Sequence, residues 1–83
     1  MTMQEFITTI NKAAEIYKGE IISLRNDFEG NLHVLLTQRN FDALDVGITN
    51  AYPCMHPANR GDLGIEKQVD NIIFTTYRQG VAS

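Results

Sequence analysis

The sequence has one cysteine, no tryptophan and two prolines among its 83 residues. The single cysteine, Cys54, cannot close an internal disulfide. No apolar run is long enough to cross a bilayer, and the first residues lack the basic and continuous apolar segments of an export signal. The sequence therefore predicts a cytoplasmic protein that does not span a membrane.

Positive charge is also scarce and is dispersed along the chain. Seven basic side chains against ten acidic ones give a net charge of −3, and the basic residues stand singly. Proteins that bind nucleic acids usually carry a basic patch or stripe. We therefore expect no nucleic-acid partner.

Several motifs that mark common enzymes are missing. The chain has no Gly-rich phosphate loop, no serine nucleophile elbow and no paired zinc-ligand spacing. Their absence excludes several large enzyme classes. The sequence predicts a non-enzymatic protein with no cofactor.

The length and composition are those of one small folded domain over residues 1–83. Hydrophobic residues make up 43% of the chain and charged residues 20%, which is ordinary for a globular protein. A single core of this size leaves little stability to spare. Binding to a partner, or formation of a homodimer, is therefore attractive.

A helix is expected over about residues 3–18. Thr2 and Glu5 have the spacing of a capping box, in which each side chain satisfies a free backbone N–H at the helix start. Gly19 ends the pattern. Apolar side chains recur between them at helical intervals: Phe6, Ile10, Ala13, Ala14 and Tyr17.

After Gly19 the apolar residues alternate, which predicts β-strands. Residues 20–25 and 32–38 form a predicted hairpin, and Gly30 supplies the positive backbone angle of its loop. Leu32, Val34 and Leu36 share one strand face. The opposite face carries a mixture of polar and apolar residues, namely Ile21, Ser23, His33, Leu35 and Thr37.

A third strand is predicted over residues 43–49 after a turn at 40–42, and a last strand over residues 71–78. The apolar spacing also allows a short helix near residues 65–70. These elements predict an α+β fold with an N-terminal helix packed on an antiparallel sheet of about four strands.

Residues 52–64 predict a long surface loop, because they hold both prolines and two glycines. Cys54 and His56 lie within it and are both competent metal ligands, but a structural zinc site needs four, which His33 or Asp62 would have to complete. The same pair has the residue types of a thiol nucleophile and its base, without an evident third group to orient them. An inert thiol beside a solvated histidine is the simpler interpretation.

Charged residues near the end of this loop resemble two known functional motifs. Asp62, Glu66 and Lys67 are residue types that hold Mg²⁺ in nucleases, but adjacent Glu66 and Lys67 would diverge, so we interpret them as a solvated cluster. Arg60, Gly61 and Asp62 match an adhesion tripeptide. A glycine turn with Asp62 capping a following helix explains them more simply.

Aromatic residues beside an arginine are typical anchors of protein interfaces. The predicted partner-binding patch consists of Phe41, Tyr52, Met55, Arg60 and Asp62. The alternative is that the aromatic residues close the ends of the core.

These features favour a small non-enzymatic protein that binds another protein through its sheet face or its proline loop. Regulators and inhibitors encoded by phages and other mobile elements are a class-level analogy. The alternative is a metal- or thiol-dependent protein centred on Cys54 and His56.

Overall fold

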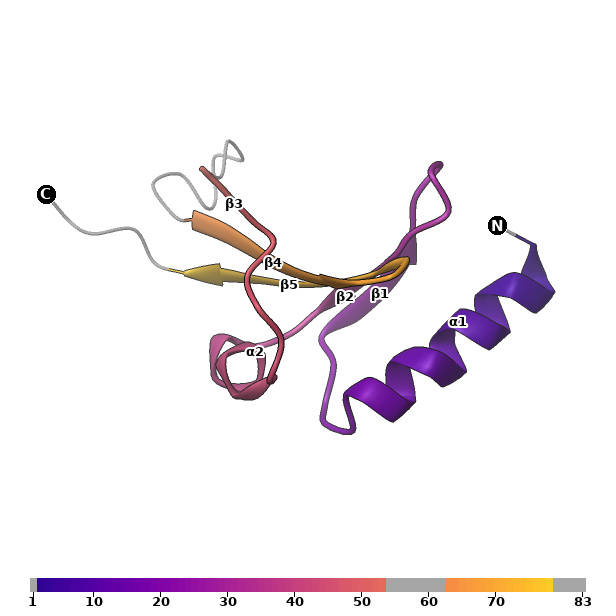
Figure 1. The fold of residues 1–83 in the computed structure, drawn as a ribbon, viewed down its shortest axis with the longest axis horizontal. Helices are drawn as coiled ribbons and strands as arrows, with labels where there is room; N and C mark the ends of the chain where they lie inside the picture. The colour runs from indigo at the N-terminus through magenta and orange to yellow at the C-terminus, as the bar shows by residue number, and fades with distance from the viewer. Residues whose placement is uncertain (1, 54–62, 79–83) are drawn as a thin grey trace, which may run out of the picture.

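The computed structural model describes residues 2–53 and 63–78, which form a two-layer α+β fold. A five-stranded sheet makes one layer, and both helices lie on the same side of it (Figure 1). The elements in chain order are α1 (Met3–Ile16), β1 (Ser23–Asn26), β2 (Leu32–Leu35), α2 (Gln38–Ala43), β3 (Asn50–Pro53), β4 (Leu63–Val69) and β5 (Ile72–Arg78).

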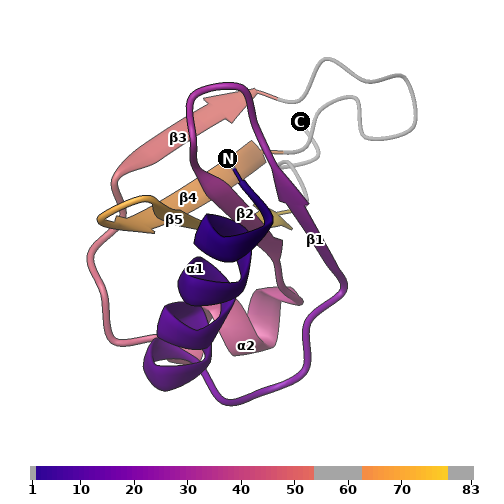
Figure 2. The same ribbon diagram turned by 90° about the vertical axis from the view of Figure 1, so that its right-hand side faces the viewer.

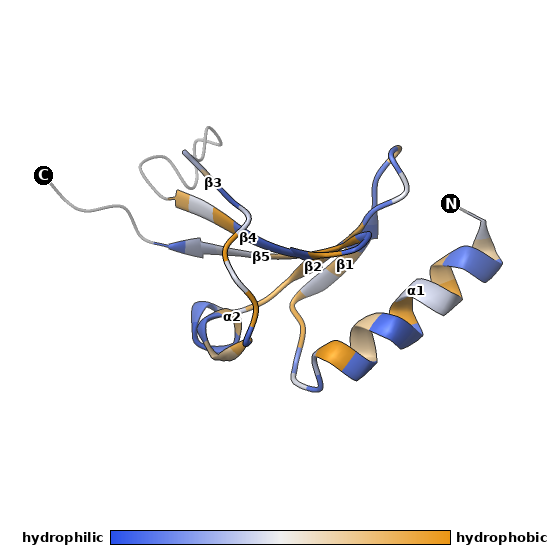
Figure 3. Ribbon diagram, in the orientation of Figure 1, coloured by the Kyte–Doolittle hydropathy of each residue, from blue (hydrophilic) through white to orange (hydrophobic). Residues whose placement is uncertain are grey.

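Helix α1 confirms the predicted N-terminal helix and its capping box. The Glu5 backbone N–H donates to Thr2 Oγ1 at 3.1 Å, and the Thr2 N–H donates to Glu5 Oε1 at 3.4 Å. The helix ends at Ile16, two residues before the predicted end, because Tyr17 already has an extended backbone. Apolar and hydrophilic residues alternate along its length (Figure 3), as an amphipathic helix on a core requires.

The predicted hairpin is confirmed as β1 and β2, which pair antiparallel with Arg25 opposite His33. Gly30 has a φ of 85°, the positive angle expected of the loop glycine. Leu32, Val34 and Leu36 are buried under the helices. The prediction that Ile21 and Leu35 share a face is wrong. Strand β1 begins only at Ser23, and Ile21 lies on the side of Leu24 and Leu32.

The sheet differs from the prediction in strand number and in direction. Its order is β1-β2-β5-β4-β3, and β5 lies between β2 and β4. The pairing of β2 with β5 is parallel, whereas the other three pairings are antiparallel. The sheet is therefore mixed, because the chain passes through α2, β3 and β4 before β5 returns beside β2 (Figure 2).

The predicted turn at 40–42 and strand at 43–49 are wrong. Thr37 caps a helix instead, since its Oγ1 accepts the Asn40 backbone N–H at 3.3 Å, and α2 runs to Ala43. The next residues bend at Leu44 and Val46, where the Val46 N–H donates to the Leu44 carbonyl, and pairing with β4 starts only where Thr49 donates to the Glu66 carbonyl. Strand β3 follows at Asn50, so the alternation of Leu44 and Val46 reflects a connection that crosses the core.

The helix allowed near residues 65–70 is also wrong, because this segment belongs to β4. β4 and β5 form a hairpin with a two-residue turn at Asp70 and Asn71, and Asp70 has a φ of 53°. This turn holds α1 against the sheet. Lys12 Nζ lies 2.5 Å from Asp70 Oδ2, and Asn71 Nδ2 donates to Thr9 Oγ1 at 3.4 Å.

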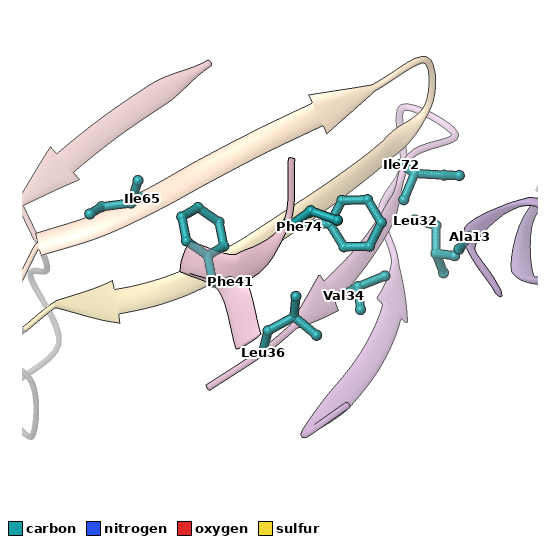
Figure 4. Close-up of a cluster of buried hydrophobic side chains, with 9 residues drawn as sticks. Ala13, Leu32, Val34, Leu36, Phe41, Ile65, Ile72 and Phe74 are labelled. Carbon is teal, nitrogen blue, oxygen red and sulfur yellow. The ribbon is translucent and has the colours of Figure 1, made fainter. Parts of the chain in front are cut away.

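The core lies between the sheet and the two helices (Figure 4). Phe74 of β5 and Phe41 of α2 are fully buried, and Tyr17 packs edge-on against Phe74 with ring centroids 6.2 Å apart. The remaining buried apolar residues of the cluster come from α1, β2, β4, β5 and the ends of α2: Ala13, Leu32, Val34, Leu36, Leu44, Ile65 and Ile72.

A lysine occupies the inner face of β4 among these apolar residues. Lys67 is 6% exposed, and its Nζ donates to the carbonyl oxygens of Phe41 at 2.7 Å and Leu44 at 2.9 Å. The same ammonium lies 4.4 Å from the centre of the Phe41 ring. Each of these carbonyls also accepts one backbone N–H, from Leu44 and Val46 respectively, so the ammonium supplies a second, charged donor at the C-terminus of α2. Lys67 is therefore buried against α2, and the prediction that it is solvated is wrong.

Replacing Lys67 by methionine should destabilise the protein by about 3 kcal/mol, since two buried carbonyls lose a charged donor. Urea unfolding measures the change. Lys12→Met is the matched control, because Lys12 pairs with Asp70 at an exposed position and should cost less than about 1 kcal/mol. Equal losses in the two variants would contradict the assigned role of Lys67.

Candidate functional site

The candidate site is the sheet face opposite the helices, here called the open face. Alternation along the strands sends every second side chain to this face. The strand register places Ser23, Leu35, Thr75, Glu66 and Asn50 in one row across all five strands. A second row contains Tyr77, Gly64 and Tyr52, and a third contains Arg25 and His33.

Where these rows meet, the open face is hollowed. The hollow has a volume of about 70 Å³. Thr75 is 7% exposed and forms part of its floor, although neither described helix covers this side of the sheet. The lining comes from all strands of the sheet: Ser23 and Arg25 of β1, His33 and Leu35 of β2, Tyr52 of β3, Glu66 of β4, and Thr75 and Tyr77 of β5.

Arg25 is the only fixed positive charge among these lining residues. It lies on β1, whose four residues are all exposed, directly opposite His33 of β2. Within residues 2–53 and 63–78, its guanidinium has no hydrogen bond and no ion pair. Its five N–H donors are therefore available to a bound molecule.

His33 is held in place by Asp27 in the β1–β2 loop. The distance from His33 Nε2 to Asp27 Oδ2 is 2.7 Å, and both side chains are mostly buried. Asp27 Oδ1 also accepts the backbone N–H groups of Glu29 and Asn31, each at 2.9 Å. The hydrogen bonds to Asp27 hold the pKa of its carboxyl group well below the usual range. The backbone N–H of Asn31 contributes most, and His33 contributes next.

Because Asp27 is ionised, the donor and the acceptor of the Asp27–His33 hydrogen bond can be assigned. A carboxylate can only accept hydrogen bonds, so the proton between the two groups belongs to His33 Nε2. The imidazole is thereby tied back toward the loop. Its orientation at the wall of the hollow is set before any ligand arrives.

Tyr52 occupies the opposite end of the open face. It pairs with Gly64 of β4, and a Cβ atom at Gly64 would collide with the Tyr52 ring. A strand glycine commonly marks such a close approach. Tyr52 and Gly64 thus belong to strands rather than to the predicted loop at 52–64, and the absence of a side chain at Gly64 leaves room for the Tyr52 ring.

Glu66 is the acidic residue among those that line the hollow. Its Oε1 accepts a hydrogen bond from Asn50 Nδ2 at 3.3 Å, and its backbone pairs with Thr75. Lys67, the next residue, points to the core, so the two side chains diverge as the sequence predicted. The open face therefore has a basic side at β1 and an acidic side at β4, with Thr75 between them.

Of the predicted partner-binding patch, the structure describes only Phe41 and Tyr52. Phe41 is fully buried, so it closes the core and cannot contact a partner. Tyr52 is half-buried and lines the hollow. Met55, Arg60 and Asp62 lie outside the described residues, as do Cys54 and His56.

His33, the third residue considered for a metal site, is bonded to Asp27. In the part of the chain that the structure describes, no group of three or more metal-ligating side chains occurs. Neither described helix has the length and apolarity that a membrane crossing requires.

The sequence contained part of the signal for the open face. Alternation in the hairpin already placed Ser23, His33 and Leu35 opposite the core residues. Arg25 follows the same period and was missed as a site residue. Glu66 could not be assigned, because the strand character of β4 was hidden by the inward-facing Lys67.

Comparison with known proteins gives no further assignment of the site. No protein-family model matches the chain, and no significant match was found among curated proteins or solved structures. The function must therefore be inferred from the described residues themselves.

The Asp27 contacts predict a specific acid sensitivity. In the unfolded chain an aspartate has a pKa of about 3.9, so folding favours the ionised form of Asp27 and is stabilised by it above about pH 4. This contribution is lost as the pH falls below that value toward the lower pKa of the folded state. Asp27→Asn should therefore be less stable than the wild type at neutral pH and should lose less stability on acidification.

Urea unfolding at neutral pH and at about pH 3 measures the difference. Asp45→Asn is the control, because Asp45 is exposed and has no hydrogen bond with a described residue. A pH dependence in Asp27→Asn as steep as that of the wild type would show that the carboxylate does not organise the loop.

Proposed function

We propose that this protein is a non-enzymatic binding module that contacts another protein through the open face. The observation that carries the proposal is the composition of that face. Two tyrosines, a leucine and Arg25, whose guanidinium has no partner among the described residues, surround one hollow on the sheet face that no described helix covers. Tyrosine and arginine are enriched at the energetic centres of protein interfaces.

The rigidity of the open face supports the same proposal. Tyr52 is seated on Gly64, and His33 is fixed by Asp27. Side chains that are already ordered lose little conformational entropy when a partner binds. A face built in this way suits recognition of a folded surface.

The setting and the biological role belong to the proposal as well. A single cysteine is compatible with a reducing compartment, so we place the interaction in the cytoplasm. A small protein whose surface occupies a partner, without a complete catalytic set, fits a regulator or an inhibitor. A second copy of the chain is the other partner to consider.

Capture of partners from a lysate of the native host tests the proposal. Tyr77→Ala removes an open-face side chain that is 40% exposed and should reduce recovery of the partner about tenfold or more, as expected of an interface anchor. Ile7→Ala is the matched control, since Ile7 is 47% exposed on α1. The Ile7→Ala variant should recover as much partner as the wild type does.

Two results would contradict the proposal. One is unchanged recovery with Tyr77→Ala while the variant keeps its fold. The other is loss of recovery with Ile7→Ala alone, which would move the contact surface to the helical side. Light scattering on the purified protein identifies self-association as the source of any captured chain of the same mass.

A further inference from the structure

We propose that the hollow of the open face binds a carboxylate group of the partner protein, with Arg25 as its principal ligand. This inference rests on the proposed function and names the chemistry that the partner must present there. A guanidinium donates two parallel hydrogen bonds that match the two oxygens of a carboxylate. Arg25 has no competing partner among the described residues.

Neighbouring polar groups support a small ligand at this position. The Ser23 hydroxyl lies on the same strand face two residues from Arg25, and both line the hollow. His33 is tied to Asp27 on its Nε2 side, so the imidazole stays at the wall. A volume of about 70 Å³ accommodates one small polar group rather than an extended chain.

Glu66 decides between a carboxylate and a more highly charged group. It lines the same hollow from β4, which β5 and β2 separate from Arg25 on β1. Repulsion between charges grows with the charge of the ligand, so Glu66 disfavours a phosphate dianion more than a carboxylate monoanion. The hollow is thus suited to an aspartate, a glutamate or a chain terminus of the partner.

Titration with a model compound tests this proposal. N-acetylglutamate α-amide carries one carboxylate, and N-acetylglutamine α-amide is its neutral counterpart of nearly the same shape. Nuclear magnetic resonance at constant ionic strength follows the Arg25 Nε–H signal and the backbone amides of β1 and β2. We expect saturable shifts with the glutamate compound and none with the glutamine compound.

Three variants make the test specific. Arg25→Gln should weaken binding about tenfold or more, because a charged hydrogen-bonded pair is lost. Glu66→Gln should tighten it by removing the repulsion. Arg39→Gln is the control, since Arg39 is an exposed arginine of α2 that has no hydrogen bond or ion pair with a described residue, and it should bind like the wild type.

The proposal is overturned if the glutamate compound gives no saturable shift, if Arg25→Gln and Arg39→Gln behave alike, or if inorganic phosphate binds more tightly than the glutamate compound. These outcomes leave the proposed function separately testable. If the compound fails to bind while Tyr77→Ala still abolishes partner capture, the open face remains the contact surface and only its carboxylate chemistry is wrong.

Discussion

The ammonium of Lys67 on the C-terminal carbonyls of α2 is the contact on which the arrangement of the molecule depends. Burying a lysine costs free energy unless its donors are satisfied, and here two carbonyl oxygens and an aromatic face receive them. The contact ties a two-turn helix, too short to be stable alone, to the inner face of β4. It fixes α2 on the side of the sheet where the Asp70–Asn71 turn holds α1.

Among the described residues, this one-sided packing leaves the open face to the strands of the sheet. Its side chains come from five strands that are distant in the sequence, and the register of the sheet brings them into rows. Local devices then fix individual residues: Asp27 orients His33, and Gly64 makes room for Tyr52. The open face is consequently ordered by the same contacts that stabilise the fold.

Local patterns in the sequence predicted the parts of the fold that depend on neighbouring residues. The capping box of Thr2 and Glu5, the hairpin with Gly30 and the strand ending near Arg78 follow from such patterns. Strand β4 was not predicted because Lys67, at an inward position, breaks the apolar alternation. The burial of this lysine is explained only by the carbonyls of α2, which are distant in the sequence. The parallel pairing of β2 with β5 cannot be predicted from local sequence either, because it joins segments about forty residues apart.

The candidate site was predicted less well, for a related reason. Phe41 and Tyr52 were grouped as aromatic residues of turns and strand ends beside an arginine, yet α2 turns Phe41 into the core. Arg25 and Glu66 have no distinguishing motif, and they become neighbours of one hollow only through the strand order. Tertiary register, rather than residue type, creates the site.

The central claim is that the open face, and not the helical side, recognises the partner. Mapping amide chemical shifts of the isotope-labelled protein, with the captured partner added, tests it most directly. The account predicts that the largest changes fall on β1, β2 and β5. Changes confined to α1, α2 or residues 54–62 would contradict it.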